Sequence, residues 1–187
     1  MVTASAEVWR EQVRNHFIAL SQEVDRAFIG GFSLGGALAT DYALSETGPR
    51  PAGLIAVAPA WQLNGLRDYL WLAPIADVFA DFVEKEPELN PVKYESFSFN
   101  AGSQIGDVIS AAQSRIIQKE SLDMPLFLAA TEADSVINLE YLVTQFRERF
   151  SNPGNAMMIF RDTRKPWPVA QADERIRFLS SYLPDAN

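Results

Sequence analysis

Apolar residues follow two patterns along the chain, and the two patterns alternate. In one, they recur at every third or fourth position, as expected of one face of a helix. The first such segment carries Trp9, Val13, Phe17, Leu20 and Val24. In the other, which covers residues 53–60 and 124–131, they run on without a break, as expected of a strand covered on both faces of a parallel sheet. The alternation predicts an α/β fold with a parallel sheet and right-handed crossovers.

The two patterns also predict the order of the elements. The first helix covers about residues 6–24, with Ser5 as its N-cap. Strands are expected at 26–32, 53–60, 124–131 and 155–160. Helices are expected at 34–45, 138–150 and 171–183, the last with Ile176, Leu179 and Leu183 facing inward. The sheet should therefore have about four parallel strands, flanked by helices.

The segment 61–120 interrupts the alternation, because it carries no strand pattern. Residues 68–84 favour a helix bent at Pro74, and residues 87–103 favour a loop. A second amphipathic helix follows, whose apolar face is Ile105, Val108, Ile109, Ala112 and Ile116. We expect an α/β core at 1–60 and 121–187 and a helical cap inserted at 61–120. The cap either covers the sheet or forms an apolar roof over a binding site.

The chemistry centres on the stretch Gly31-Phe32-Ser33-Leu34-Gly35, between a predicted strand and a predicted helix. This is the G-x-S-x-G pattern of a nucleophile elbow, in which a serine is held on a sharp, strained turn. Gly31 and Gly35 are expected to leave room for that turn, and the Leu34 N–H is expected to face an oxyanion at the helix N-terminus. The alternative is an ordinary glycine-rich turn before a helix.

Composition and charge narrow the function classes. The net charge of −8 and the lack of a basic cluster argue against nucleic-acid binding. No apolar run reaches the length of a membrane span, and residues 1–6 lack the layout of a signal peptide. The chain has no cysteine, which excludes disulfides and thiolate chemistry. We expect a cytoplasmic protein without metal or cofactor.

Three stretches together resemble the α/β-hydrolases. They are residues 30–39 around the elbow, 53–60, and 125–134, which reads Pro-Leu-Phe-Leu-Ala-Ala-Thr-Glu-Ala-Asp. With the stretch at 94–104, they are most similar to the serine-aminopeptidase, lysophospholipase and monoacylglycerol-lipase-like branch. The resemblance covers nearly the whole chain, in the right order.

The resemblance implies roles for individual residues. Ser33 would be the nucleophile, and Asp134 the acid that orients a base. A carboxylate just past the end of a parallel strand also lies on the sheet edge where α/β sites are found. Asp134 could instead be a turn or N-cap residue, and Glu132 is a weaker alternative for the acid.

The sequence departs from the family at two places. Its single histidine, His16, precedes the elbow on the first helix, where we expect it at the surface. Lys165 occupies the slot that the family's histidine usually holds, although it could be a solvated loop residue. The family also has about four strands before the elbow strand, and here one helix precedes Arg26. The chain thus looks like a hydrolase without its N-terminal half-sheet.

Two functions remain open. One is a serine hydrolase that cleaves small acyl or lipid-like esters through an acyl-enzyme at Ser33. The other is a catalytically impaired remnant that binds a small-molecule ligand or a partner.

Without the missing strands, the strand from Arg26 to Phe32 becomes an open edge with little charge to defend it. We therefore expect a homo-oligomer that associates through this edge and the first helix.

Overall fold

The structure is a computed structural model that describes residues 5–65, 99–161 and 173–180. In these ranges the helices are α1 (Ala6–Ser21), α2 (Leu34–Leu44), α4 (Phe99–Ile117) and α5 (Leu139–Arg149). The strands are β1 (Ile29–Phe32), β2 (Leu54–Val57), β3 (Leu126–Thr131), β4 (Ala156–Arg161) and β5 (Ile176–Ser180).

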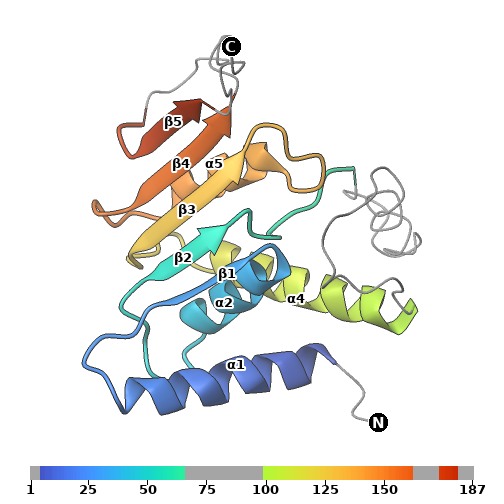
Figure 1. The fold of residues 1–187 in the computed structure, drawn as a ribbon, viewed down its shortest axis with the longest axis vertical. Helices are drawn as coiled ribbons and strands as arrows, with labels where there is room; N and C mark the ends of the chain where they lie inside the picture. Colours follow the sequence, from blue (N-terminus) through green and yellow to red (C-terminus); the bar gives the residue numbers. More distant parts are fainter. Residues whose placement is uncertain (1–4, 66–98, 162–172, 181–187) are drawn as a thin grey trace, which may run out of the picture.

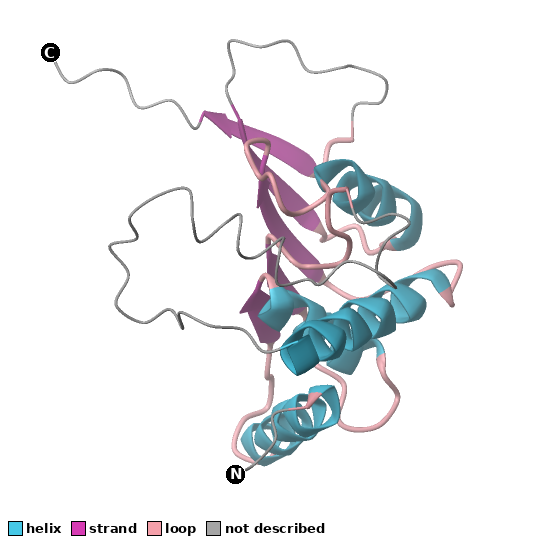
Figure 2. Cartoon of the chain, turned by 90° about the vertical axis from the view of Figure 1, so that its right-hand side faces the viewer, coloured by secondary structure: helices cyan, strands magenta, loops and turns pink. Residues whose placement is uncertain are grey.

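The strands form one sheet in the order β1-β2-β3-β4-β5, and all neighbouring pairs are parallel. Every strand therefore ends at the same edge of the sheet, the edge from which α2 and the loops after β2 and β3 depart (Figure 1). Seen along the sheet, the described helices lie on one side of it (Figure 2). The α/β class and the parallel sheet predicted from the sequence are confirmed.

The core lies between the sheet and the helices. Leu54, Ala56, Leu128 and Ile159 face it from the strands. The predicted apolar face of the helix α4 is buried throughout: Ile105, Val108, Ile109, Ala112 and Ile116. α4 packs chiefly on α2, and α2 also packs on β1 and β2. Two helix layers therefore cover the β1–β2 end of the sheet.

A buried carboxylate joins three helices. The Asp41 side chain on α2 accepts hydrogen bonds from Arg10 Nε of α1 at 2.8 Å and from Arg115 Nε of α4 at 3.2 Å. The Asp41 side chain is only 8% exposed, so two guanidinium groups compensate for its loss of hydration. This arrangement fixes α1 and α4 against α2.

Most predicted elements are present, with shorter strands. Ser5 is the N-cap of α1, and its Oγ accepts a hydrogen bond from Val8 N. The strand predicted at 26–32 begins at Ile29, and the one predicted at 53–60 ends at Val57. α4 starts at Phe99, inside the loop predicted at 87–103. Residues 66–98, which include the other predicted cap helix, lie outside the described residues, so the helical cap remains a prediction.

The helix predicted at 171–183 is wrong, because residues 176–180 form the fifth strand. Ile176 and Leu179, which a helix would place on one face, point to opposite faces of a strand. A turn ahead of the strand decides the conformation. The Asp173 carboxylate accepts bonds from the backbone N–H and the guanidinium of Arg175, and Arg175 O accepts the Met157 N–H of β4. The Arg175 guanidinium also lies 4.8 Å from the Phe146 ring centroid.

The expectation of an open edge at the elbow strand is confirmed for the described residues. β1 stands at the end of the strand order and pairs only with β2. On α1, however, Phe17 is buried, and Trp9 and Val13 are half-buried against the core. α1 thus packs its apolar face, at these three positions, against the core.

The Asp173–Arg175 turn makes the stability of the protein depend on pH. Hydrogen bonds from Arg175 hold the pKa of Asp173 below its ordinary value. Because the folded pKa is the lower one, this contribution is complete above the unfolded pKa of about 3.9 and is lost as the pH falls through the folded pKa. We expect Asp173→Asn to lower the free energy of unfolding by about 1 kcal/mol at pH 7, and the difference to shrink below about pH 4. Urea unfolding at both pH values measures this.

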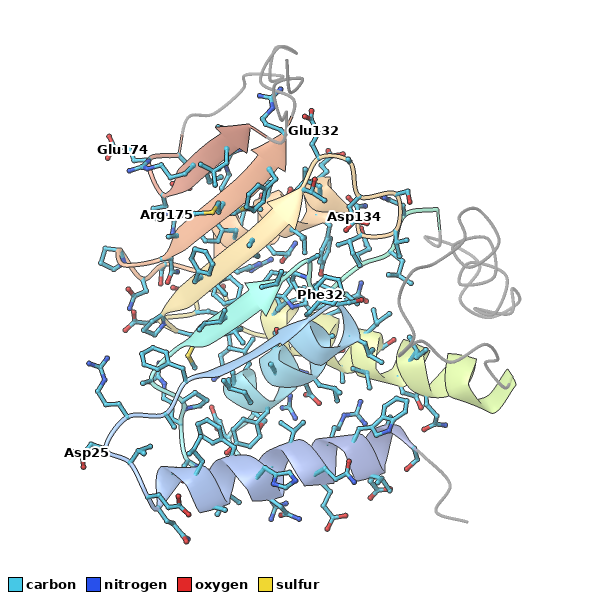
Figure 3. All side chains as sticks on the ribbon, in the orientation of Figure 1. Asp25, Phe32, Glu132, Asp134, Glu174 and Arg175 are labelled. Carbon is cyan, nitrogen blue, oxygen red and sulfur yellow. The ribbon has the colours of Figure 1, made fainter. Side chains whose placement is uncertain are left out.

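The matched control is Asp25→Asn, at an exposed position (Figure 3). Asp25 precedes β1, which is at the other end of the strand order from β5. It should leave the free energy of unfolding nearly unchanged at both pH values. A constant deficit for Asp173→Asn from pH 7 to pH 3 would show that its charge does not stabilise the turn.

Candidate active site

Ser33 occupies a strained turn between β1 and α2. Its backbone has φ 52° and ψ −118°, a region that side-chain-bearing residues rarely adopt and that costs about 1–3 kcal/mol. Ala58, the residue that follows β2, has a φ of 39° and is the other non-glycine residue with positive φ in the described ranges. Both lie at the carboxyl edge of the sheet. Strain of this kind persists only where the surrounding structure enforces it.

The turn is tight because β1 and α2 almost touch. A Cβ on Gly31 would lie 2.3 Å from the carbonyl carbon and oxygen of Gly35, a distance at which atoms overlap. Gly31 therefore has no room for a side chain, and the backbone that excludes one belongs to α2. For Gly35 the reason was wrong, because a Cβ there would meet nothing within 4 Å. Gly36 is another tight position, because its Cβ would come within 2.9 Å of Pro59 Cβ.

Hydrogen bonds from the loop after β2 hold the Ser33 backbone. Ser33 N donates to Val57 O at 3.0 Å, which continues the β1–β2 ladder past the end of β1. Ser33 O accepts from Ala60 N at 2.9 Å and from Ala37 N at 3.2 Å. The backbone is thus fixed from the strand side, the helix side and the neighbouring loop. This accounts for a strained conformation in the middle of a well-packed region.

The Ser33 hydroxyl is available for chemistry. Although Ser33 is the N-cap of α2, its side chain makes no capping hydrogen bond. The Leu34 N–H begins the helix and, like the first amides of any helix, has no intrahelical acceptor. The helix N-terminus favours negative charge at this position. A half-buried hydroxyl beside an available N–H is the arrangement that acyl transfer requires of a nucleophile and an oxyanion donor.

The loop after β2 connects the elbow to the loop after β3. Asn64 N donates to Val136 O at 2.7 Å, and Asn64 Nδ2 donates to Ile137 O at 3.1 Å. Leu63 forms an isolated bridge with Ile137. Since Ala60 of the same loop bonds to Ser33 O, one short segment positions both the elbow and the residues beside Asp134.

Asp134 lies at the carboxyl edge, as the sequence predicts, and Figure 3 shows it on the same side of the sheet as Phe32 and Glu132. Its Oδ1 accepts hydrogen bonds from the backbone N–H groups of Val136 and Ile137, both at 2.8 Å. Asp134 Oδ1 therefore stabilises the turn, which is the alternative role that the sequence left open. Glu132 is engaged elsewhere, because its Oε2 lies 3.4 Å from Nε of the buried Arg161. Asp134 therefore stays the candidate for the acid, ahead of Glu132.

The described residues do not identify the base. His16 is exposed on α1, as the sequence predicts. Lys165 lies outside the described residues. Among the residues that are described, no cluster of three or more His, Cys, Asp and Glu could hold a metal ion. The assignments of Ser33, Leu34 and Asp134 remain predictions that this geometry supports.

Comparisons with known proteins give similarity in structure but not in sequence. No protein-family profile matches the sequence, and no curated protein matches it. A structure reported for LipS and LipT, two metagenome-derived lipolytic enzymes, has 16% sequence identity and a TM-score of 0.60, covering 83% of this chain and 63% of that one. The monoacylglycerol lipase of Paleococcus ferrophilus has 19% identity and a TM-score of 0.57, covering 84% and 66%.

A soluble variant of the monoglyceride lipase of Saccharomyces cerevisiae, bound to a substrate analogue, is also similar, with 14% identity and a TM-score of 0.52. The chain has the α/β-hydrolase fold. It spans 58–66% of the length of these proteins, so it corresponds to part of their fold. At these identities the similarity establishes the fold and leaves the chemistry to the residues of this chain. No helix in its described ranges is long and apolar enough to cross a membrane.

Sequence reasoning missed the residues that support the elbow from outside the motif. Gly36 and Pro59 pack against each other, and the Ala60 N–H holds Ser33 O. The adjacent Gly35-Gly36 pair and the proline at the end of an apolar run were the available signals. They gave no indication of which glycine needed the space, because that depends on the neighbouring loop.

The two glycines of the motif provide a matched test of the elbow geometry. We expect Gly31→Ala to lower the free energy of unfolding by about 2–3 kcal/mol, because its Cβ would overlap the Gly35 backbone. Gly35→Ala should leave stability unchanged or raise it by up to about 1 kcal/mol, since alanine is the better helix residue. Chemical denaturation of the two variants measures both effects. Equal destabilisation by the two substitutions would contradict the close approach of β1 and α2.

Proposed function

We propose that this protein is a serine hydrolase that cleaves carboxylic esters of small acyl or lipid-like substrates. The strained Ser33 backbone, with an uncapped hydroxyl beside the Leu34 N–H, is the observation that carries the proposal. Two of the structural neighbours are a monoacylglycerol lipase and a monoglyceride lipase, which supports an ester as the substrate class. A fold shared with lipolytic enzymes would not support this function without the local geometry at Ser33.

The reaction would proceed in two steps. Ser33 Oγ attacks the ester carbonyl carbon as its proton passes to a base, and the Leu34 N–H stabilises the oxyanion. The intermediate collapses to an acyl-enzyme, and the alcohol leaves with a proton. Water then cleaves the acyl-enzyme by the same route and restores Ser33. Asp134 would orient the base, for which Lys165 is the candidate by resemblance.

The alternative function is that of a binding module that no longer hydrolyses its ligand. The observation in its favour is that the chain's one histidine, His16, is exposed on α1 and lies outside the elbow region. Lysine activates a serine only when its pKa is lowered greatly, so a lysine base demands a special environment. Under this alternative, an ester would bind reversibly at the elbow without cleavage.

Ser33→Ala separates the two functions. We expect the wild-type chain to hydrolyse p-nitrophenyl butyrate above the buffer rate, and Ser33→Ala to abolish that activity with the thermal midpoint changed by only a few degrees. The matched control is Ser45→Ala, at the C-cap of α2 on the opposite end of the helix. It should retain the wild-type rate. Equal turnover by wild type and Ser33→Ala would remove the elbow from the mechanism, and reversible ester binding without turnover would favour the binding module.

Lys165 is tested by converting it to the residue that it replaces. If Lys165 holds the base position, Lys165→His should raise ester hydrolysis at pH 7 by roughly tenfold or more, because imidazole titrates near neutrality. Lys165→Gln, which removes the base, should reduce hydrolysis. The rates of both variants against pH check the assignment. Identical profiles for wild type, Lys165→His and Lys165→Gln would show that Lys165 is not the base.

A further inference from the structure

On one face of the sheet, the described part of the chain leaves a layer of apolar side chains uncovered. Strand residues alternate between the two faces, and the residues opposite those of the core point away from the helices. They include Phe28, Phe32, Ile55, Val57, Phe127, Phe160 and Leu179, which are between 37% and 70% exposed. We call this set the open face. The described helices all lie on the other side of the sheet, so they leave it uncovered (Figure 2).

The strand register makes the open face continuous. Phe32 lies beside Val57, Ile55 beside Phe127, and Phe160 beside Leu179. Ala129 and Met158 are also paired and lie between the larger side chains. The layer thus reaches from β1, at one edge of the sheet, to β5 at the other.

The open face has little charge. Two arginines stand at its ends: Arg177, on the edge strand β5 and paired with Met158, and Arg26, whose guanidinium lies 5.8 Å from the Phe28 ring centroid. The protein as a whole has a net charge of −8. Like charges elsewhere would keep two copies apart, but the centre of this surface, on β2 and β3, presents none to repel a second copy. An acidic or basic partner would likewise find no charge to pair with on β2 and β3.

The size of the open face matches half of an interface between proteins. At their exposed fractions, these side chains leave on the order of 600 Å² accessible, which is at the upper limit of the roughly 300–600 Å² of the largest apolar patch on a typical monomer. A standard-size interface buries about 800 Å² on each partner. The large side chains of the open face alone supply about three quarters of that amount.

We propose that the open face is the surface through which two copies of this chain associate. A two-fold axis makes a single surface self-complementary, so one apolar layer can cover another without a separate partner site. Two sheets that pack in this way lie about 10 Å apart with their strands about 30° from parallel. This places the interface on the sheet face, whereas the sequence alone predicted the β1 edge and α1.

The two locations are distinguished by paired substitutions. The variant Ile55→Thr/Phe127→Thr makes the centre of the open face polar and keeps β-branched residues, which favour strands. The control Leu20→Gln changes an apolar residue of α1 with similar exposure, 43%. Multi-angle light scattering of the wild-type chain at micromolar concentration should give twice 20.8 kDa. The open-face variant should weaken dimerisation at least tenfold, and Leu20→Gln should leave it unchanged.

Disulfide trapping gives a second readout that does not depend on a polar substitution. Because the chain has no cysteine, each single-cysteine variant reports on one position. Mild oxidation should link two copies of at least one of Ile55→Cys, Phe127→Cys and Phe160→Cys, and should leave Leu20→Cys unlinked. A folded far-UV circular dichroism spectrum is required of each variant before comparison.

Several results would overturn the proposal. A wild-type monomer up to 100 micromolar would do so, as would dissociation by Leu20→Gln with the open-face variant still dimeric. Aggregates without a defined mass would also contradict a two-fold interface. Sedimentation of monomers with phosphatidylcholine vesicles, lost in Ile55→Thr/Phe127→Thr, would show that the open face binds lipid instead of a second copy.

Discussion

The close approach of β1 and α2 is the constraint on which the rest of the site depends. Gly31 lies so near the Gly35 backbone that no side chain fits between them. The chain can turn from strand to helix within one residue only because Gly31 carries no side chain. Ser33 takes up the strain of the turn with a positive φ. Hydrogen bonds to Val57 O and from Ala60 N then hold the strained backbone in place. The positions of the Ser33 hydroxyl and the Leu34 N–H follow from that geometry.

The same constraint extends across the carboxyl edge of the sheet. The loop that holds Ser33 through Ala60 also holds the β3 loop through Asn64, and Asp134 stabilises that loop with two backbone hydrogen bonds. Asp134 is therefore both a structural turn residue and the carboxylate nearest in role to a catalytic acid. The turn uses Oδ1, so the acid role proposed for Asp134 would fall to Oδ2. Because no base is identified beside Ser33, this arrangement could bind a substrate analogue without turning over a substrate.

The sequence predicted the parts of the fold that local patterns determine. The run at 124–131 identified a strand and the periodic residues of α4 identified a helix, because the two structures space their apolar residues differently. The expectation that both faces of this strand are covered is wrong for the described residues, since Phe127 is 37% exposed on the open face. Residues 176–180 were predicted wrongly, since five apolar and polar residues fit either spacing and the Asp173–Arg175 turn decides between them. Gly35 was given the role of Gly36 for a similar reason. Contacts to a neighbouring loop cannot be read from the spacing of a motif.

Labelling with a fluorophosphonate, read by intact mass, tests the central claim that the elbow makes Ser33 reactive. The account predicts one phosphonate per native chain, none on Ser33→Ala and none on wild-type protein in urea, because reactivity depends on the folded turn. A folded wild-type chain that stays unlabelled while a serine esterase in the same tube is fully labelled would contradict it. So would equal labelling of the wild type and Ser33→Ala.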